Sequence, residues 1–335
     1  MYRNMNNMLL ESVAKDLVAS AKGILAADES SKTIQKRFDK IGLKSDPDTN
    51  LAYRKMLFTS PGIENYISGI ILFDETIRQS IDGVLIPEYL SKKNILPGIK
   101  VDKGTVDLPN FPGEKITEGL DGLKGRLMEY AKLGATFAKW RAVITIGKNI
   151  PTDNCIVANA EVLAKYAFLC QEQDIVPIVE PEVLMDADNT LEICKDATNR
   201  TLKALFAKLK DNSVILEGLI LKTNMVISGK KCSIQASSQE IAKETVETFL
   251  RVVPKEIAGV VFLSGGQTPD QATENLAEIN MVAGNPWQLS YSYGRALQDE
   301  ALTAWAGKNE NVVEAQKAFI ERVKKVSEAR SQHPS

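Results

Sequence analysis

The sequence predicts an eight-stranded (β/α)8 TIM barrel with an N-terminal helix and a C-terminal helical extension. Short apolar runs alternate with longer amphipathic stretches along all 335 residues, which is typical of βα units around a parallel sheet. The apolar runs number eight, the strand number of this barrel. No Pro/Gly/Ser-rich linker divides the chain. We therefore expect one domain over 1–335, with a helical extension at 1–22, the barrel at 23–306 and a helix and tail at 307–335.

The predicted strands and helices follow one another in regular order. The strands are expected at 23–28, 66–73, 96–102, 137–144, 175–180, 216–223, 258–264 and 287–292. Helices with apolar residues every three or four positions are expected at 123–133, 159–171, 189–209, 240–252 and 271–279. Leu9, Val13 and Leu17 share a helical face before the first strand, and 312–330 reads as a further amphipathic helix after the last. A doubly wound nucleotide-binding fold is the alternative, but no glycine-rich fingerprint follows any strand.

Composition excludes several functional classes. The formal net charge is −2 without long runs of like charge, so we expect no nucleic-acid partner. Charged residues interrupt the N-terminal segment and no stretch approaches the ~20 apolar residues of a membrane span, which predicts a cytoplasmic protein without a membrane partner. The four cysteines are widely spaced, and the only histidine is His333. We therefore expect neither a metal nor a cofactor, and any chemistry must use Lys, Arg, Asp, Glu, Ser or Tyr.

Charged and polar side chains gather where the predicted strands end. They are Asp28 on the first strand, Lys100 and Asp102 on the third, Lys139 and Arg141 on the fourth, Glu180 and Glu182 on the fifth, and Lys222 and Asn224 on the sixth. Residues two apart in a strand share a face, and barrel active sites lie at the C-terminal ends of the strands. A single pair could equally be a structural ion pair. Five strands together indicate an active site, because converging buried charges are costly.

Lys222 ends an apolar run and is expected to point into a cavity that also holds Lys139 and Arg141. Like charges and desolvation both disfavour a protonated amine, which favours a nucleophilic lysine able to form a Schiff base. The alternative is a lysine that extends from the strand end to solvent.

Two basic corners are predicted around this lysine. Loops after the last two strands carry Ser264, Gly265, Ser292, Gly294 and Arg295, the usual phosphate corner of such a barrel. Ser30, Thr33, Lys36 and Arg37 follow the first strand and can combine with Lys100 and Arg141. The glycines could instead serve only to end the strands, and Ser30 could serve only as the N-cap of a helix that runs to residue 41. Two basic corners imply a substrate with two anionic ends.

Seven sequence blocks carry a family resemblance. They are GILAADES (23–30), GIKVDKG (98–104), FAKWR (137–141), PIVEPE (177–182), LILKTNMV (219–226), FLSGGQ (262–267) and SYGRALQ (292–298). In this order they resemble the class I fructose-1,6-bisphosphate aldolases over nearly the whole chain. That resemblance implies a (β/α)8 barrel, often a homotetramer, that cleaves fructose 1,6-bisphosphate reversibly to dihydroxyacetone phosphate and glyceraldehyde 3-phosphate without a metal or cofactor.

The resemblance also implies residue roles. Lys222 matches the Schiff-base lysine, Asp28 the acceptor of the C4 hydroxyl proton, Glu180 the general acid/base, Lys139 its support and Glu182 an orienting neighbour. One phosphate is expected at Ser264, Gly265, Gly294 and Arg295, and the other at Ser30, Thr33, Lys100 and Arg141, with Lys36 and Arg37 nearby. The alternatives are another Schiff-base barrel lyase or a transaldolase, which need the lysine but perhaps one phosphate corner, and a non-catalytic barrel scaffold, which needs neither.

Overall fold

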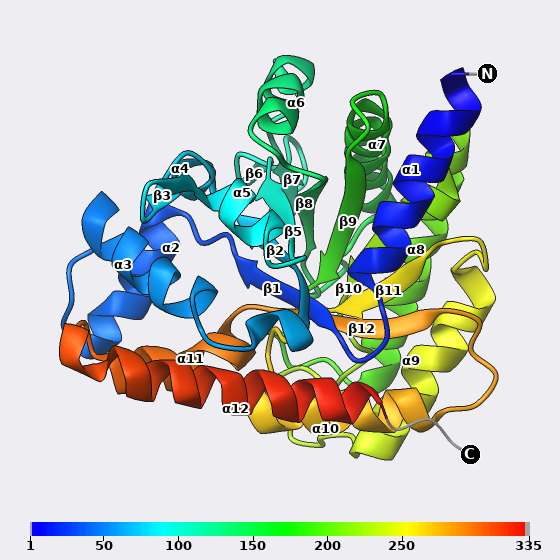
Figure 1. Ribbon diagram of the computed structural model, residues 1–335. Coiled ribbons are helices and arrows are strands. Elements are labelled where there is room, and N and C mark those ends of the chain that lie inside the picture. The colour runs from blue at the N-terminus through cyan, green and yellow to red at the C-terminus, as the bar shows by residue number, and fades with distance from the viewer. Residues whose placement is uncertain (1, 332–335) are drawn as a thin grey trace.

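The computed structural model describes residues 2–331 and confirms the predicted fold class. Its barrel closes in the order β1-β12-β11-β10-β9-β8-β5-β2, with all neighbours parallel (Figure 1). The barrel strands are β1 (Gly23–Ala27), β2 (Ile67–Leu72), β5 (Leu96–Lys100), β8 (Phe137–Ile144), β9 (Val176–Val183), β10 (Ile220–Thr223), β11 (Gly259–Phe262) and β12 (Gln288–Tyr293). His333 and the rest of the predicted tail beyond Ser331 lie outside the described residues. The division into extensions and barrel stays a prediction.

Each predicted strand corresponds to an observed one, and two boundaries differ by three residues or more. β9 continues past Glu180 to Val183 because it pairs with β8 along its whole length, as far as Ile144. The run at 216–223 begins with a 3-10 turn, η3 (Leu216–Gly218), that packs under the N-terminal helix, so β10 starts only at Ile220.

The helices surround the barrel as crossover elements or extend it at the chain ends. They are α1 (Tyr2–Leu17), α2 (Ser31–Phe38), α3 (Pro47–Phe58), α4 (Asp74–Ile77), α5 (Ile86–Ser91), α6 (Leu123–Lys132), α7 (Asp153–Gln171), α8 (Leu191–Asp211), α9 (Ser238–Val252), α10 (Pro269–Met281), α11 (Arg295–Trp305) and α12 (Val312–Arg330). The helix predicted from residue 159 begins at Asp153, where Thr152 accepts a bond from the Cys155 amide as N-cap. The helix expected to reach residue 41 ends at Phe38 and continues as the 3-10 turn η1 (Asp39–Ile41).

Short segments between the main elements complete the chain. Two hairpins, β3 (Ser80–Ile81) with β4 (Val84–Leu85) and β6 (Thr105–Asp107) with β7 (Lys115–Thr117), lie outside the barrel sheet. Two further 3-10 turns are η2 (Ile63–Asn65) and η4 (Asn309–Asn311). The sequence analysis predicted none of these segments, since each is too short to show a period.

Apolar side chains from α1 close the N-terminal opening of the barrel. Leu10 and Leu17 belong to one buried cluster with Phe137 and Ile220 from the strands. The Phe137 ring occupies the space beside β5, where a Cβ on Gly98 would lie only 2.2 Å from it. Apolar side chains therefore fill the barrel interior at this end.

The last residue of α12 fastens the C-terminal helix to the same end. Arg330 is buried and donates hydrogen bonds to the carbonyls of Val18, Ala19, Lys22 and Leu289 and to the side chain of Gln288. Burial lowers the pKa of Arg330 to about 10, so it remains a cation at neutral pH. The extension is thus held by a guanidinium surrounded by backbone oxygens.

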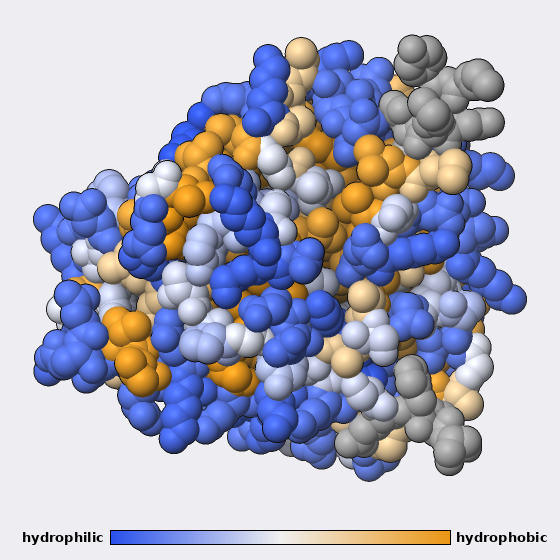
Figure 2. All heavy atoms as spheres, in the orientation of Figure 1, coloured by the Kyte–Doolittle hydropathy of each residue, from blue (hydrophilic) through white to orange (hydrophobic). Residues whose placement is uncertain are grey.

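Hydrophilic side chains cover much of the face seen in Figure 2, while hydrophobic atoms gather in a band across its upper part. Isolated exposed apolar residues are ordinary on a folded surface. Within residues 2–331, no helix has both the length and the apolar character needed to cross a membrane.

Candidate active site

A buried ammonium group lies at the centre of the charged strand ends. Lys139 on β8 places its Nζ 2.7 Å from Asp28 Oδ2, 3.3 Å from Glu180 Oε2 and 3.9 Å from Asp102 Oδ2. These carboxylates come from the ends of β1, β9 and β5, so parallel strands bring together residues far apart in sequence. The structure therefore assembles four of the predicted strand-end side chains into one cluster.

The predicted nucleophile joins this cluster through Glu180. Lys222 on β10 is buried, and its Nζ lies 3.2 Å from Glu180 Oε1. Glu180 therefore lies between two ammonium groups, one on each carboxylate oxygen. The sequence argument placed cations around Lys222, and Lys139 lies on the other side of this carboxylate. What the sequence did not reveal is the carboxylate between the two amines, which makes proton exchange between Lys222 and Glu180 possible.

Opposing effects set the protonation states of Asp28 and Lys139. Burial alone would raise the pKa of Asp28, but the ammonium of Lys139, assisted by Lys222 and Lys100, holds it well below its usual value. Burial alone would lower the pKa of Lys139, but Asp28, Glu180 and Asp102 raise it well above its usual value. At neutral pH the two groups are therefore a carboxylate and an ammonium.

Glu182 connects the central cluster to the loop after β11. Its carboxylate forms an ion pair with Arg141, and it lies so close to Gly265 that a Cβ there would be 3.0 Å from its Oε1. Burial would lower the pKa of Arg141, but Glu182 and then Glu180 raise it. Arg141 is thus already paired in the absence of substrate.

The loops after β11 and β12 leave polar groups free. Ser292 is buried at the end of β12, and its hydroxyl has no hydrogen-bond partner among residues 2–331. Arg295 at the start of α11 is exposed, and Gly294 before it passes so close to the Ala26 carbonyl that a Cβ would lie 3.3 Å away. Ser264 is half-buried in the preceding loop. Hydroxyls, glycine backbone and a guanidinium thus gather here, as an anion site requires.

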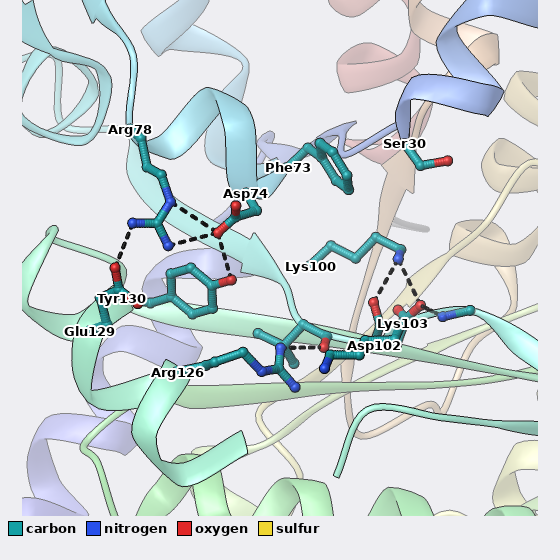
Figure 3. Close-up of a pocket in the computed structure, with 12 residues that line it drawn as sticks. Ser30, Phe73, Asp74, Arg78, Lys100, Asp102, Lys103, Arg126, Glu129 and Tyr130 are labelled. Atoms are coloured by element: carbon teal, nitrogen blue, oxygen red, sulfur yellow. Dashed lines mark hydrogen bonds and ion pairs between the residues drawn. The ribbon is translucent and has the colours of Figure 1, made fainter. Parts of the chain in front are cut away.

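The second corner opens into a cavity of about 540 Å³. Figure 3 shows Ser30 and Lys100 among the residues that line it, with the Lys100 amine directed to Asp102 at 2.7 Å. The Ser30 hydroxyl lies 3.1 Å from that of Thr33 and does not cap α2, although Ser30 occupies the N-cap position. The capping alternative is therefore wrong for its side chain. Lys222 does not line this cavity.

The outer wall of the cavity is a set of mutually neutralising charges (Figure 3). Arg78 bonds Asp74 at 2.9 Å and Glu129 at 2.5 Å, and the Tyr130 hydroxyl donates to Asp74 at 2.8 Å. Because these groups satisfy one another, Lys100 and Ser30 are the polar groups of this cavity best placed for an anionic ligand.

Arg37 and Lys36 are not brought into the central cluster. Arg37 is largely buried behind the first loop, where it pairs with Glu29 at 2.6 Å and donates to Gln298 Oε1 at 2.7 Å. Lys36 is exposed on α2. No pattern in the sequence signalled the Glu29 pair, because Glu29 lies beyond the end of β1, where strand alternation no longer predicts side-chain direction.

Comparison with known proteins decides the family. Residues 9–333 match the family model described as fructose-bisphosphate aldolase class-I. The chain belongs to this family. It is 52% identical over 317 residues to a probable fructose-bisphosphate aldolase class 1 of Xanthomonas campestris, covering 94% of this chain and 95% of that protein. It is 51% identical over 310 residues to a cytosolic aldolase of Arabidopsis thaliana, covering 92% and 79%.

A solved aldolase from Plasmodium falciparum, in complex with TRAP and a small-molecule inhibitor, has the same fold. Its TM-score is 0.96 at 46% identity, covering 98% of this chain and 96% of that one. For this aldolase-family chain, no group of three or more His, Cys, Asp or Glu side chains arranged for a metal occurs within residues 2–331. The carboxylates of the site converge on lysine instead.

Two residues of the site received no role in the sequence analysis. Asp102 contacts both Lys100 and Lys139, and its same-face position with Lys100 was the available signal. Asn224, two residues beyond Lys222, is buried and accepts a hydrogen bond from the Val183 amide on the neighbouring strand. Its contacts depend on strand register, which alternation alone does not reveal.

Proposed function

We propose that this protein cleaves fructose 1,6-bisphosphate reversibly to dihydroxyacetone phosphate and glyceraldehyde 3-phosphate through a Schiff base on Lys222, in glycolysis and gluconeogenesis. The single observation that carries the proposal is Glu180 between two buried amines, 3.2 Å from Lys222 and 3.3 Å from Lys139. Family membership supports the same reaction. No metal or cofactor takes part in it.

Glu180 is the proposed proton carrier for imine formation. It accepts a proton from Lys222, whose amine then adds to the C2 carbonyl of the open-chain sugar. Glu180 returns a proton to the departing hydroxyl, so water leaves and an iminium forms. Lys139 remains an ammonium beside the other oxygen of Glu180 and stabilises its charged form.

Asp28 is the proposed base for bond cleavage. Its low pKa keeps it a carboxylate, 2.7 Å from Lys139, so it can accept the C4 hydroxyl proton while the C3–C4 bond breaks. The bonding electrons move into the iminium and give an enamine, and glyceraldehyde 3-phosphate leaves. Protonation and hydrolysis of the enamine then release dihydroxyacetone phosphate and restore Lys222. Glu182 would orient Arg141 during these steps.

The two phosphates are proposed to bind at opposite corners. Ser264, Gly265, Ser292, Gly294 and Arg295 would hold one, and their unpaired groups support this. Ser30, Thr33, Lys100 and Arg141 would hold the other, which requires Lys100 and Arg141 to exchange carboxylate partners for phosphate. Lys36 and Arg37 would contribute only through a change of conformation, since Arg37 is paired with Glu29.

Location and assembly belong to the same proposal. A cytoplasmic protein is supported by the cytosolic Arabidopsis relative. A homotetramer is implied by the resemblance to the aldolase family, and the exposed side chains of Met8 and Leu9 on α1 are candidates for its interfaces. Sedimentation equilibrium at several protein concentrations tests the assembly.

Borohydride reduction in the presence of dihydroxyacetone phosphate tests the reaction. We expect the three-carbon ketone phosphate to be trapped on Lys222, and Lys222→Ala to abolish trapping. A transaldolase or another Schiff-base lyase would form the imine but would not cleave the bisphosphate efficiently, and a scaffold would do neither. Cleavage activity should also survive exhaustive chelation; loss that zinc restores would contradict the proposal.

A further inference from the structure

The barrel wall is weakly joined beside the proposed nucleophile. The ladder between β9 and β10 has only two paired positions and ends at Leu221 and Val179, one residue before Lys222 and Glu180. On the other side of β9, the ladder with β8 continues to Val183. The backbone therefore fixes Glu180 relative to β8 but not, by the same means, relative to Lys222.

The Asn224 side chain crosses this gap. It is 1% exposed, and its Oδ1 accepts a hydrogen bond from the Val183 amide at 3.0 Å. Its Nδ2 donates to Thr198 Oγ1 on α8 and to the Met225 carbonyl, both at 3.1 Å. A carboxamide with both ends bonded to different elements has one orientation, so it holds the ends of β9 and β10 at a set separation.

We infer that Asn224 is a positioning residue for catalysis: its bond to Val183 sets the distance between Lys222 and Glu180. The inference rests on the proposed function, in which these two groups exchange protons. Their present separation of 3.2 Å is within hydrogen-bond reach. If the strand ends moved apart, proton transfer would slow, while the phosphate-binding side chains, which lie on other strands and loops, would remain in place.

A purely structural role is the alternative, since buried amides are ordinarily hydrogen-bonded and removing one destabilises a fold. Thr198 supplies the matched control. Thr198→Val removes a hydrogen-bond partner of the same carboxamide and keeps the volume, but it leaves the bond from Asn224 to Val183 in place. A structural role predicts that both variants behave alike once folded, whereas a positioning role predicts that only Asn224→Ala loses catalysis.

The experiment compares the full-length wild type, Asn224→Ala and Thr198→Val by urea unfolding, by steady-state cleavage of fructose 1,6-bisphosphate and by the rate of borohydride trapping with saturating dihydroxyacetone phosphate. For Asn224→Ala we expect kcat and the trapping rate to fall about 10- to 100-fold while KM changes less than about threefold. For Thr198→Val we expect both rates within about twofold of wild type despite a loss of stability.

Wild-type rates in folded Asn224→Ala, or equal losses in the two variants, would overturn the inference and leave the proposed function intact. Trapping of the wild type on a residue other than Lys222 would overturn the proposed function as well. If Asn224→Ala does not fold, Asn224→Ser replaces it, because its hydroxyl is one bond too short to span the gap and the same rate losses are expected.

Discussion

The two ends of the barrel hold buried charge in opposite ways. At the C-terminal end, Lys139 and Lys222 lie against carboxylates that can give and accept protons. At the N-terminal end, Arg330 lies against four backbone carbonyls and the Gln288 amide, which cannot accept a proton at ordinary pH. The same fold thus provides one set of charges suited to chemistry and another suited only to fastening the chain.

This difference makes the two ends separately testable. Substitution of Lys222 at the C-terminal end should change rates more than stability, because Glu180 keeps Lys139 as a partner. Substitution at the N-terminal end should change stability more than rates, because the carbonyls around Arg330 have no replacement donor.

The largest effect is expected for Lys222→Met. Loss of the nucleophile should lower kcat by about 10⁴-fold or more. Glu180 keeps its contact with Lys139, so the free energy of unfolding should change by less than about 1 kcal/mol. Steady-state assays and urea unfolding measure the two quantities. A variant that loses several kcal/mol of stability would show that this lysine also fastens the barrel, and the contrast between the ends would fail.

Lys139→Met should reduce kcat by about 100-fold and also change its pH dependence. The Lys139 ammonium holds the pKa of Asp28 down, whereas burial raises it, so removing the ammonium lets this pKa rise. Asp28 would then become protonated at higher pH, and the acid limb of the residual pH–rate profile should move upward by about one unit or more.

Lys195→Met provides the control for this shift. Lys195 forms a partly buried ion pair with Glu244 between α8 and α9, outside the cluster of Asp28 and Lys139. Its loss should leave the acid limb unchanged. An unshifted profile in Lys139→Met would mean that Asp28 is not the group whose protonation limits the reaction.

Arg330→Ala should destabilise the protein by about 3 kcal/mol, since it leaves several buried carbonyls without a donor. The folded variant should keep kcat within about twofold, which assays well below its unfolding midpoint can check. Arg330→Lys should recover little of the stability lost in Arg330→Ala, because a single ammonium cannot reproduce the planar array of N–H donors of the guanidinium. A large fall in kcat in the folded variant would show that the N-terminal end is coupled to the site.

The sequence predicted the strands well because each is an apolar run that the barrel buries on both faces. It also predicted which strand ends carry charge, since position in a run and alternation are visible in one chain. Alternation does not reveal which side chains meet across the barrel. For that reason the contact between Lys222 and Glu180 was not predicted, although both residues were named as strand-end charges.

Elements that depend on tertiary contacts were missed for related reasons. The role of Arg330 depends on carbonyls that belong to the turn after α1 and to β12, and nothing local in α12 signals them. Asn224 likewise becomes informative only when the early end of the β9–β10 ladder is known. A side chain that bonds across two strands beyond the end of their backbone ladder cannot be predicted until the end of that ladder is known.

The smallest effects should separate the two corners within the C-terminal end. Arg295→Ala should weaken the binding of fructose 1,6-bisphosphate and of fructose 1-phosphate alike, whereas Lys100→Ala should weaken mainly the binding of the bisphosphate. Each loss should be about 1.5–3 kcal/mol, because one charge-assisted contact is removed. The reason is geometric: Arg295 begins α11 beside Ser292, while Lys100 lines the cavity with Ser30. Values of kcat/KM for both sugars test this. Lys100 also releases Asp102 when it is removed, so Lys195→Ala, which likewise releases the carboxylate of Glu244 but lies between α8 and α9, serves as the control. It should change kcat/KM for neither substrate by more than about twofold. Equal losses on both substrates for Arg295→Ala and Lys100→Ala would mean that both cations serve one phosphate, and the second corner would then have no part in binding.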